Sequence, residues 1–384
     1  MRKTYLKFSV PDITQQDIDA VVETLKSGWL TTGKQSQQLE NQFAEATGAE
    51  YAVSLSSGTS ALFLSLIAEG AEPGDEVIVP PLTFASTANV VHHVGARPVF
   101  ADINPETFNL DPDAAAAAVT SRTRAVIPVH YAGQPCEMNR IMELAEKNHL
   151  SVIEDAAHAL GAEINGQRIG GQGNLSCFSL FPTKNITAGE GGMVTLNDPE
   201  KDNRLRKLRL HGMSKDGWKR YRREGSWYYE IHEAGYKCNL SDINAALALT
   251  QLKRLDEINR RRRRLADLYR DKIHDIPGIH PQKQIPGMKS AWHIFPVWVD
   301  RKRYGLGRDQ LIKELWRRNI GTSVHFIPVH LHPFYQKTYG YREGDFPMSE
   351  KVFRGILSLP LFPRMQEKDV DDVAAALHEI SDEL

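Results

Sequence analysis

Groups that could do chemistry follow three short apolar runs of this sequence. Asp155 ends the run "LSVIED", and Ser179 and Lys184 end "LSCFSLFPTK", just before a glycine-rich loop. Gly58 and Thr59 lie within "SLSSGTSALF", where a strand is expected to give way to a helix. The free N–H groups and dipole of a helix start suit a phosphate. The three runs thus offer a carboxylate, an amine and a phosphate cradle.

Pyridoxal phosphate is one cofactor that needs all three groups. Its aldehyde is captured by a lysine amine, its ring nitrogen must stay protonated beside a carboxylate, and its phosphate must be anchored. A desolvated lysine also loses its proton more readily, so Lys184 could serve as a base. Each residue alone has a simpler reading. Asp155 could be a helix cap, the Gly58 region could be capping chemistry, and Lys184 could be a solvated surface residue.

The elements that must position these groups alternate along the first half of the chain. Apolar, β-branched runs such as "YAVSLSS", "DEVIVPP", "RPVFADI" and "LSVIEDAA" are separated by helical stretches such as "GTSALFLSLIAEG" and "CEMNRIMELAEKN". This alternation predicts a mostly parallel sheet covered on both faces. Ligands of such sheets collect at the carboxyl ends of the strands, where Asp155 and the loop of Lys184 are expected to lie.

The second half of the chain has a different texture. Residues 241–273 carry one long helical pattern with Ser241 as its N-cap. Shorter strands are predicted at 293–299 and 322–326, with helices at 308–319 and 367–380. We therefore expect a large α/β domain over 12–250 and a smaller α/β domain over 251–384, with the N-terminal residues 1–11 packing against the smaller one.

Composition limits the classes of function. The chain has 384 residues, of which 41% are hydrophobic and 25% charged, and its formal net charge is −1, so nothing draws it to nucleic acid or acidic membranes. Its three cysteines are far apart, which indicates neither a disulfide framework nor a metal site and fits the cytoplasm. We expect no signal peptide and no membrane insertion. The arginine run 260–264 is expected to be the solvated face of a helix.

Several stretches occur in an order that is familiar from one family. The segments "SGWLTTG", "SSGTSAL", "VIEDAAHALGA", "FSLFPTKNITAGEGG" and "GYKCNLSDINAALALTQL" resemble the DegT/DnrJ/EryC1/StrS sugar aminotransferases over nearly the whole chain. The stretches "IPVHYAG" and "NLSDINAALALTQL" are similar to the branch that aminates UDP-linked 4-keto sugars, with pentose or hexose rings. The resemblance implies the fold of aspartate aminotransferase (fold type I) and amino transfer from L-glutamate, which becomes 2-oxoglutarate, to a nucleotide-linked keto sugar for cell-surface polysaccharide or glycan.

The resemblance also implies a role for individual residues. Lys184 would be the Schiff-base lysine and the acid–base group, and Asp155 would pair with the pyridinium nitrogen. The remaining expected cofactor contacts are Gly58, Thr59, Phe84, His158 and Ser179, with Asn239 reaching the phosphate from the second subunit of a homodimer. The expected contacts with sugar or nucleotide are Gly28, Trp29, Thr31 and His325.

Two departures from the family pattern bear on these expectations. Relatives often carry a histidine where this chain has Phe181, which removes any contact of that histidine, and some carry tryptophan in place of Phe84. A cofactor-dependent sugar dehydratase on the same fold is one alternative, but that branch replaces the lysine with histidine. A regulator that binds a ligand without turnover is another, although it would need no electron sink. A nicotinamide dehydrogenase is the least expected alternative, because no G-x-G-x-x-G motif directly follows an early strand of this sequence.

Overall fold

The computed structural model of the protein describes residues 2–214 and 228–383. Its main feature is a seven-stranded sheet in the order β1-β9-β8-β5-β4-β2-β3. The strands are β1 Tyr51–Leu55, β2 Glu76–Val79, β3 Arg97–Phe100, β4 Thr123–Val126, β5 Ser151–Asp155, β8 Leu175–Ser179 and β9 Gly192–Leu196. Only β9 runs against the others, because it pairs antiparallel with both β1 and β8 while the remaining pairs are parallel. The sheet is therefore mostly parallel, as predicted.

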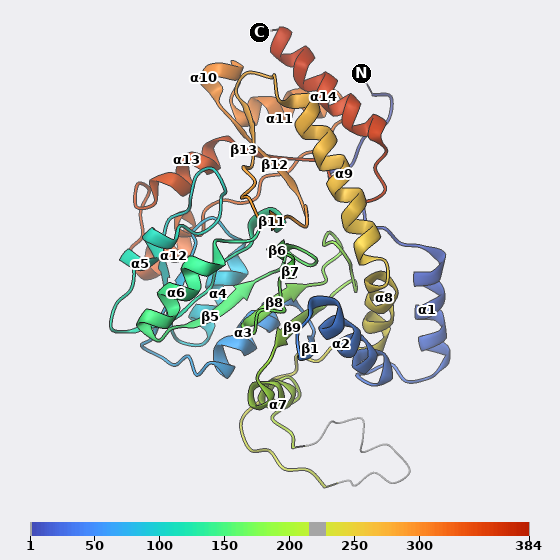
Figure 1. The fold of residues 1–384 in the computed structure, drawn as a ribbon, viewed down its shortest axis with the longest axis vertical. Helices are drawn as coiled ribbons and strands as arrows, with labels where there is room; N and C mark the ends of the chain where they lie inside the picture. The colour runs from blue at the N-terminus through green and yellow to red at the C-terminus, as the bar shows by residue number, and fades with distance from the viewer. Residues whose placement is uncertain (1, 215–227, 384) are drawn as a thin grey trace.

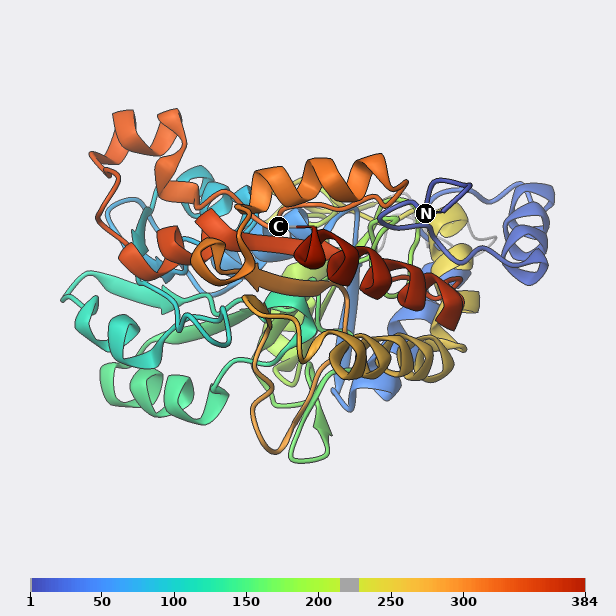
Figure 2. The same ribbon diagram turned by 90° about the horizontal axis from the view of Figure 1, so that it is seen from above.

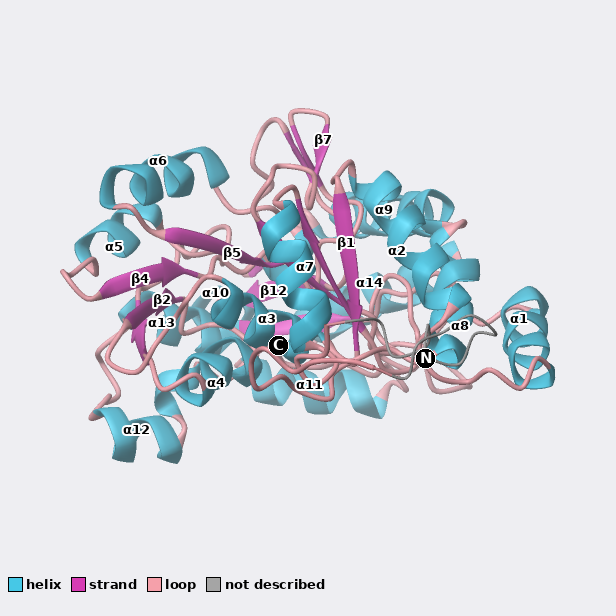
Figure 3. Ribbon diagram, turned by 90° about the horizontal axis from the view of Figure 1, so that it is seen from below, coloured by secondary structure: helices cyan, strands magenta, loops and turns pink. Residues whose placement is uncertain are grey.

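Helices cover both faces of this sheet (Figure 3). One apolar cluster joins one face to residues of α2, α5, α6 and α8, and another joins the opposite face to residues of α3, α4 and α7. The helices of the first 252 residues are α1 Gln15–Lys26, α2 Lys34–Thr47, α3 Gly58–Ala68, α4 Ala85–His93, α5 Pro112–Ala117, α6 Met138–Asn148, α7 Pro199–Leu208 and α8 Asp242–Leu252. Strands buried on both faces explain the continuous apolar runs in the sequence.

The C-terminal part is built on a smaller antiparallel sheet of β10 Ile279–Pro281, β12 Phe295–Val299 and β13 Ile356–Leu359. Its helices are α9 Leu255–Ile273, α10 Arg301–Tyr304, α11 Arg308–Arg317, α12 Pro333–Tyr339, α13 Pro347–Gly355 and α14 Glu367–Asp382. A third sheet joins β6 Glu163–Ile164, β7 Gln167–Arg168 and β11 Met288–Lys289. Figure 1 shows α9 running from the region of α8 up to α14.

Helix α9 contributes to two apolar clusters. Its first turns, with Leu255 and Ile258, belong to the core under the large sheet, and its later turns, with Leu265 and Tyr269, belong to the core of the C-terminal part. Because one continuous helix serves both cores, the division into 12–250 and 251–384 stays a prediction.

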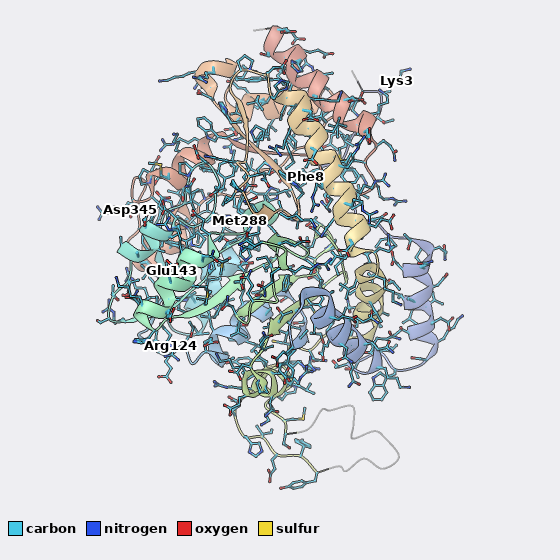
Figure 4. All side chains as sticks on the ribbon, viewed as in Figure 1. Lys3, Phe8, Arg124, Glu143, Met288 and Asp345 are labelled. Carbon is cyan, nitrogen blue, oxygen red and sulfur yellow. The ribbon has the colours of Figure 1, made fainter. Side chains whose placement is uncertain are left out.

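The N-terminal segment lies against the C-terminal part. Leu6 forms a parallel bridge with Ile320, and the amide of Leu6 donates to the carbonyl of Asn319 over 2.8 Å. Figure 2 shows the N-terminus close to α14. Phe8, labelled in Figure 4, places its ring 5.4 Å from that of His325. The segment therefore reaches a residue that sequence analysis expected in the substrate site.

Three local predictions were wrong. The pattern over 241–273 is two helices rather than one, since α8 ends at Leu252 and α9 starts at Leu255. At this break Arg254 turns its guanidinium to Asp12 and Asp17, an interaction that a pattern of apolar spacing does not reveal. Ser241 does cap α8, accepting from the amide of Asn244.

The segment 322–326 is extended but makes only an isolated bridge, Ser323 with Ser358, so it is not a strand. The arginine run is not wholly solvated either. Arg262 is 2% exposed and donates to the carbonyls of His293 and Leu361, because helical periodicity turns the middle of the run inward. Among the described residues, none of the helices has the combination of length and apolar character needed to cross a membrane.

Candidate active site

A cavity of about 290 Å³ opens at the carboxyl edge of the large sheet. Asp155 ends β5, and Ser179 ends the neighbouring β8, so both residues reach this edge. Lys184 lies in the loop between β8 and the reversed strand β9. Eight of the expected site residues line the cavity: Gly58, Thr59, Phe84, Asp155, His158, Ser179, Lys184 and His325.

The start of α3 forms one wall of the cavity. Ser57 caps this helix, since its hydroxyl accepts from the amide of Ser60 over 3.0 Å and its carbonyl accepts from Ala61. The amides of Gly58 and Thr59 come one turn too early to find a carbonyl inside the helix. They are therefore the donors that α3 can offer to an anion, reinforced by the helix dipole.

Two glycines let the sheet approach this helix start closely. A Cβ added to Gly58 would lie 2.9 Å from the Cβ of Ser179, which brings the serine hydroxyl beside the helix start. A Cβ added to Gly192 would lie only 2.2 Å from the carbonyl oxygen of Ser57. Sequence analysis did not single out Gly192, which begins β9 directly after the loop that carries Lys184. The close packing shapes a cradle that fits a phosphate.

Asp155 is a buried carboxylate with two donors. It is 5% exposed, its Oδ2 accepts from the hydroxyl of Thr87 over 2.7 Å, and its Oδ1 accepts from the amide of Ala157 over 3.2 Å. Burial raises the pKa of Asp155, against the lowering effect of these bonds and of Lys184. A cationic ring nitrogen placed beside this carboxylate would offset its burial.

Lys184 has an amine that can lose its proton near neutral pH. Burial lowers the pKa of Lys184 to about 8, and the charge of Asp155 only partly opposes the shift. An amine with this pKa is available both as a nucleophile toward an aldehyde and as a base. The residues present therefore fit pyridoxal phosphate, with Lys184 for its aldehyde, Asp155 for its ring nitrogen and the start of α3 for its phosphate.

Histidines and phenylalanines line a second wall of the cavity. The ring of His158 lies 4.3 Å from that of His293 and is stacked on Phe326, with centroids 6.1 Å apart. The ring centroid of Phe326 also lies 5.8 Å from that of Phe84. His293 and Phe326 were not expected here, because no motif surrounds them and they lie more than 100 residues from Lys184 in the chain. Only the fold brings them to the cavity.

The histidines of this wall are held neutral. Burial, with the nearby charge of Lys184, lowers the pKa of His325 to about 4. The pKa values of His158 and His293 are also well below the ordinary range, for the same leading reason. His158 accepts from the amide of Ala132 at its Nδ1, so its proton stands on Nε2, which makes it a donor.

The other four expected residues lie away from this cavity in the single chain. The side-chain Nδ2 of Asn239 donates to the hydroxyl of Thr32 over 2.7 Å, and the indole of Trp29 donates to the carbonyl of Thr32. The loop carrying Gly28, Trp29 and Thr31 therefore forms one cluster with Asn239, and none of these residues lines the described cavity. Contacts of this cluster with cofactor or substrate stay predictions.

Comparisons with known proteins agree with this geometry. The model of the DegT/DnrJ/EryC1/StrS aminotransferase family matches residues 11–378. The chain is 49% identical over 380 residues to the spore coat polysaccharide biosynthesis protein SpsC of Bacillus subtilis, covering 99% of this chain and 98% of that protein. It is 42% identical over 386 residues to the UDP-4-amino-4-deoxy-L-arabinose–oxoglutarate aminotransferase of Shewanella sediminis, covering 99% of each.

The solved structures confirm the expected fold and cofactor. The sugar aminotransferase Spr1654 of Streptococcus pneumoniae, in its PMP form, superposes with a TM-score of 0.92 at 34% identity, covering 98% of this chain and 99% of that one. Its PLP form gives the same TM-score at 33% identity, covering 99% of each chain. The chain belongs to the DegT/DnrJ/EryC1/StrS aminotransferase family and is a sugar aminotransferase that uses pyridoxal phosphate.

Proposed function

We propose that this enzyme moves an amino group from L-glutamate to a nucleotide-linked keto sugar, namely a UDP-linked 4-keto hexose or pentose. The observation that carries the reaction type is the meeting of Lys184 and Asp155 with the start of α3 in one cavity. The sugar class is supported by the relative from Shewanella sediminis, whose name specifies a UDP-linked amino sugar. The name of SpsC supports a role in surface polysaccharide.

Lys184 is the proton carrier of the proposed reaction. Pyridoxal phosphate, when bound, supplies an aldehyde that exchanges between amines and a ring that accepts the electrons of a broken C–H bond. The Nζ of Lys184 takes the proton from the α-carbon of glutamate and later returns a proton to the sugar carbon. Its pKa of about 8 lets the same atom act as base and acid.

The other cavity residues hold and orient the reactants. Asp155 keeps a positive charge beside its carboxylate, and Gly58, Thr59 and Ser179 bind the phosphate. His158 donates from Nε2, Phe84 places its ring against the cofactor, and His325 faces the sugar. Neutral histidines suit this wall, because a protonated histidine beside Lys184 would lower the pKa of its amine further.

A homodimer with shared sites completes the proposal. Gly28, Trp29 and Thr31 share a loop that is bonded through Thr32 to Asn239. A second copy could bring this whole cluster over the cavity, so that Asn239 reaches the phosphate and the loop reaches the substrate. We place the reaction in the cytoplasm, in keeping with three cysteines that suggest no disulfide framework.

The test is a half-reaction with a panel of substrates. The enzyme is first converted with L-glutamate to its pyridoxamine form, and UDP-, dTDP- and GDP-linked keto sugars are then added separately while the aldehyde absorbance is followed. We expect a UDP-linked 4-keto sugar to restore that absorbance fastest. Failure of glutamate to produce the pyridoxamine form would favour a ligand-binding regulator. Ammonia release from a sugar nucleotide without any donor would favour a dehydratase.

A further inference from the structure

Two buried asparagines join the loops that form the cavity. Asn185, which directly follows Lys184, donates from Nδ2 to the Oδ1 of Asn259 over 2.7 Å and to the carbonyl of Ala291 over 2.8 Å. Asn259, on α9, donates from its own Nδ2 to the carbonyl of Leu160 over 2.9 Å. Both asparagines are 5% exposed.

These bonds connect three segments that carry cavity residues. Leu160 lies two residues after His158, Ala291 lies two residues before His293, and Asn185 is the neighbour of Lys184. Asn259 itself does not line the cavity. Asn259 is therefore placed to act on the cavity through other residues.

The packing around Asn259 leaves little room for it to move. A Cβ added to Gly161 would lie 2.3 Å from the Nδ2 of Asn259. The φ of Gly161 is +80°, a left-handed value that favours glycine. One helical turn later, Arg262 donates to the carbonyl of His293 over 3.0 Å, so the same face of α9 holds two points near the cavity.

We propose that Asn259 is a positioning residue for Lys184, acting through the amide of Asn185. The inference rests on the proposed role of Lys184 as the residue that captures the cofactor and carries the proton. A lysine side chain has four rotatable bonds, so its amine is directed only as well as its backbone is held. Misplacement of a reacting atom by about 1 Å can reduce a rate by about 100-fold.

The test compares Asn259→Ala and Asn185→Ala with a matched control. Asn109 is 3% exposed. Its side-chain amide also bonds to backbone, since its Nδ2 donates to the carbonyls of Gln134 and Pro135 and its Oδ1 accepts from the backbone amide of Tyr131. These partners belong to another loop. Asn109→Ala therefore removes a comparable buried amide without touching the Lys184 loop. Urea unfolding shows how much stability each variant loses.

Two readouts follow Lys184 itself. One is the rate at which cofactor-free protein captures pyridoxal phosphate at Lys184, trapped with borohydride and located by peptide mapping. The other is turnover. We expect Asn259→Ala and Asn185→Ala each to slow capture and kcat by roughly 10-fold or more, with KM for the sugar changed less than about two-fold. Asn109→Ala should keep the rate of capture at equal or greater loss of stability.

The double variant decides whether the two amides act as one unit. If Asn259 works through Asn185, the double variant is no slower than Asn185→Ala alone. Wild-type capture and kcat in Asn259→Ala would overturn the inference while leaving the proposed function intact. If Asn259→Ala fails to fold, unchanged rates in Asn185→Ala overturn it equally. Trapping at a residue other than Lys184 would instead overturn the proposed function, and this inference with it.

Discussion

The hydroxyl of Thr87, on α4, donates a 2.7 Å hydrogen bond to the Oδ2 of Asp155, at the end of β5. Thr87 is itself fully buried, and its hydroxyl also lies 2.8 Å from that of Thr83. The chain thus supports its buried carboxylate from α4, the helix that follows β2 in the chain. Neither threonine was predicted from the sequence, because a bond between residues 87 and 155 leaves no local pattern.

Replacing Thr87 tests what this bond contributes. In Thr87→Val the pKa of Asp155 should rise further, since a donor to its charged form is lost while its burial persists. A hydrogen bond to a charged group is worth about 1.5–3 kcal/mol, so we expect cofactor affinity or kcat to fall about 10- to 100-fold. Equilibrium dialysis with pyridoxal phosphate and steady-state rates measure the two effects. Thr120→Val also removes a hydroxyl that donates to a carboxylate, that of Glu76, and serves as the control away from the cavity. Equal behaviour of the two variants would remove Thr87 from the site.

Lys184 should make the free energy of unfolding of the cofactor-free enzyme rise with pH in the alkaline range. Its folded pKa of about 8 lies below the ordinary 10.5, so between these values the unfolded chain binds a proton that the folded chain does not. The free energy of unfolding therefore rises with pH in this window, by about 2 kcal/mol from pH 8 to pH 10 for this residue. Urea unfolding of wild type and Lys184→Met should show the variant more stable at pH 8, with its advantage shrinking by pH 10. A constant difference between the two proteins would argue that the amine is not desolvated.

His325 should make the free energy of unfolding depend on pH with the same sign as Lys184, but in the acidic range. Its folded pKa is about 4, against an ordinary 6.5, so the unfolded chain binds the extra proton between pH 6.5 and pH 4. The free energy of unfolding falls as the pH drops through this range, by roughly 1–3 kcal/mol for this residue. In His325→Gln that part of the fall should be missing, as measured by urea unfolding at pH 4.5 and 7. His280→Gln, on β10 and outside the cavity, should keep the wild-type slope.

Mixing inactive subunits tests whether active sites are shared. Lys184→Ala alone should lose covalent capture of the cofactor and about 10³-fold of the rate, as expected for loss of a nucleophile. Asn239→Ala alone should bind phosphate weakly and lose activity at limiting cofactor. If Asn239 serves the cavity of the second subunit, refolding the two variants together restores one intact site per mixed dimer, or about a quarter of wild-type activity. No recovery, in mixtures shown by mass spectrometry to contain mixed dimers, would place Asn239 in its own chain's site or outside both.

Local sequence patterns were sufficient to predict where candidate site residues lie when those residues end a strand. Asp155 and Ser179 could be placed because continuous apolar runs predicted parallel strands, and parallel strands deliver their last residues to one edge. Lys184 followed from its loop. His293, Phe326 and Asn259 could not be found in this way, since each reaches the cavity or its loops from a segment whose own pattern describes only its packing. The break between α8 and α9 was missed for the same reason, because the partners of Arg254 lie at residues 12 and 17.

The absence of a side chain at Gly192 has a consequence for anyone who wishes to retool this enzyme for other substrates. The reversed strand and the start of α3 touch there backbone to backbone, so a methyl group would push the two apart rather than merely fill a gap. Libraries that diversify the glycine-rich stretch should therefore hold position 192 constant and vary position 181, where the ring of Phe181 is 44% exposed. The substrate selectivity of the enzyme can then change while the packing of β9 against the start of α3 is kept.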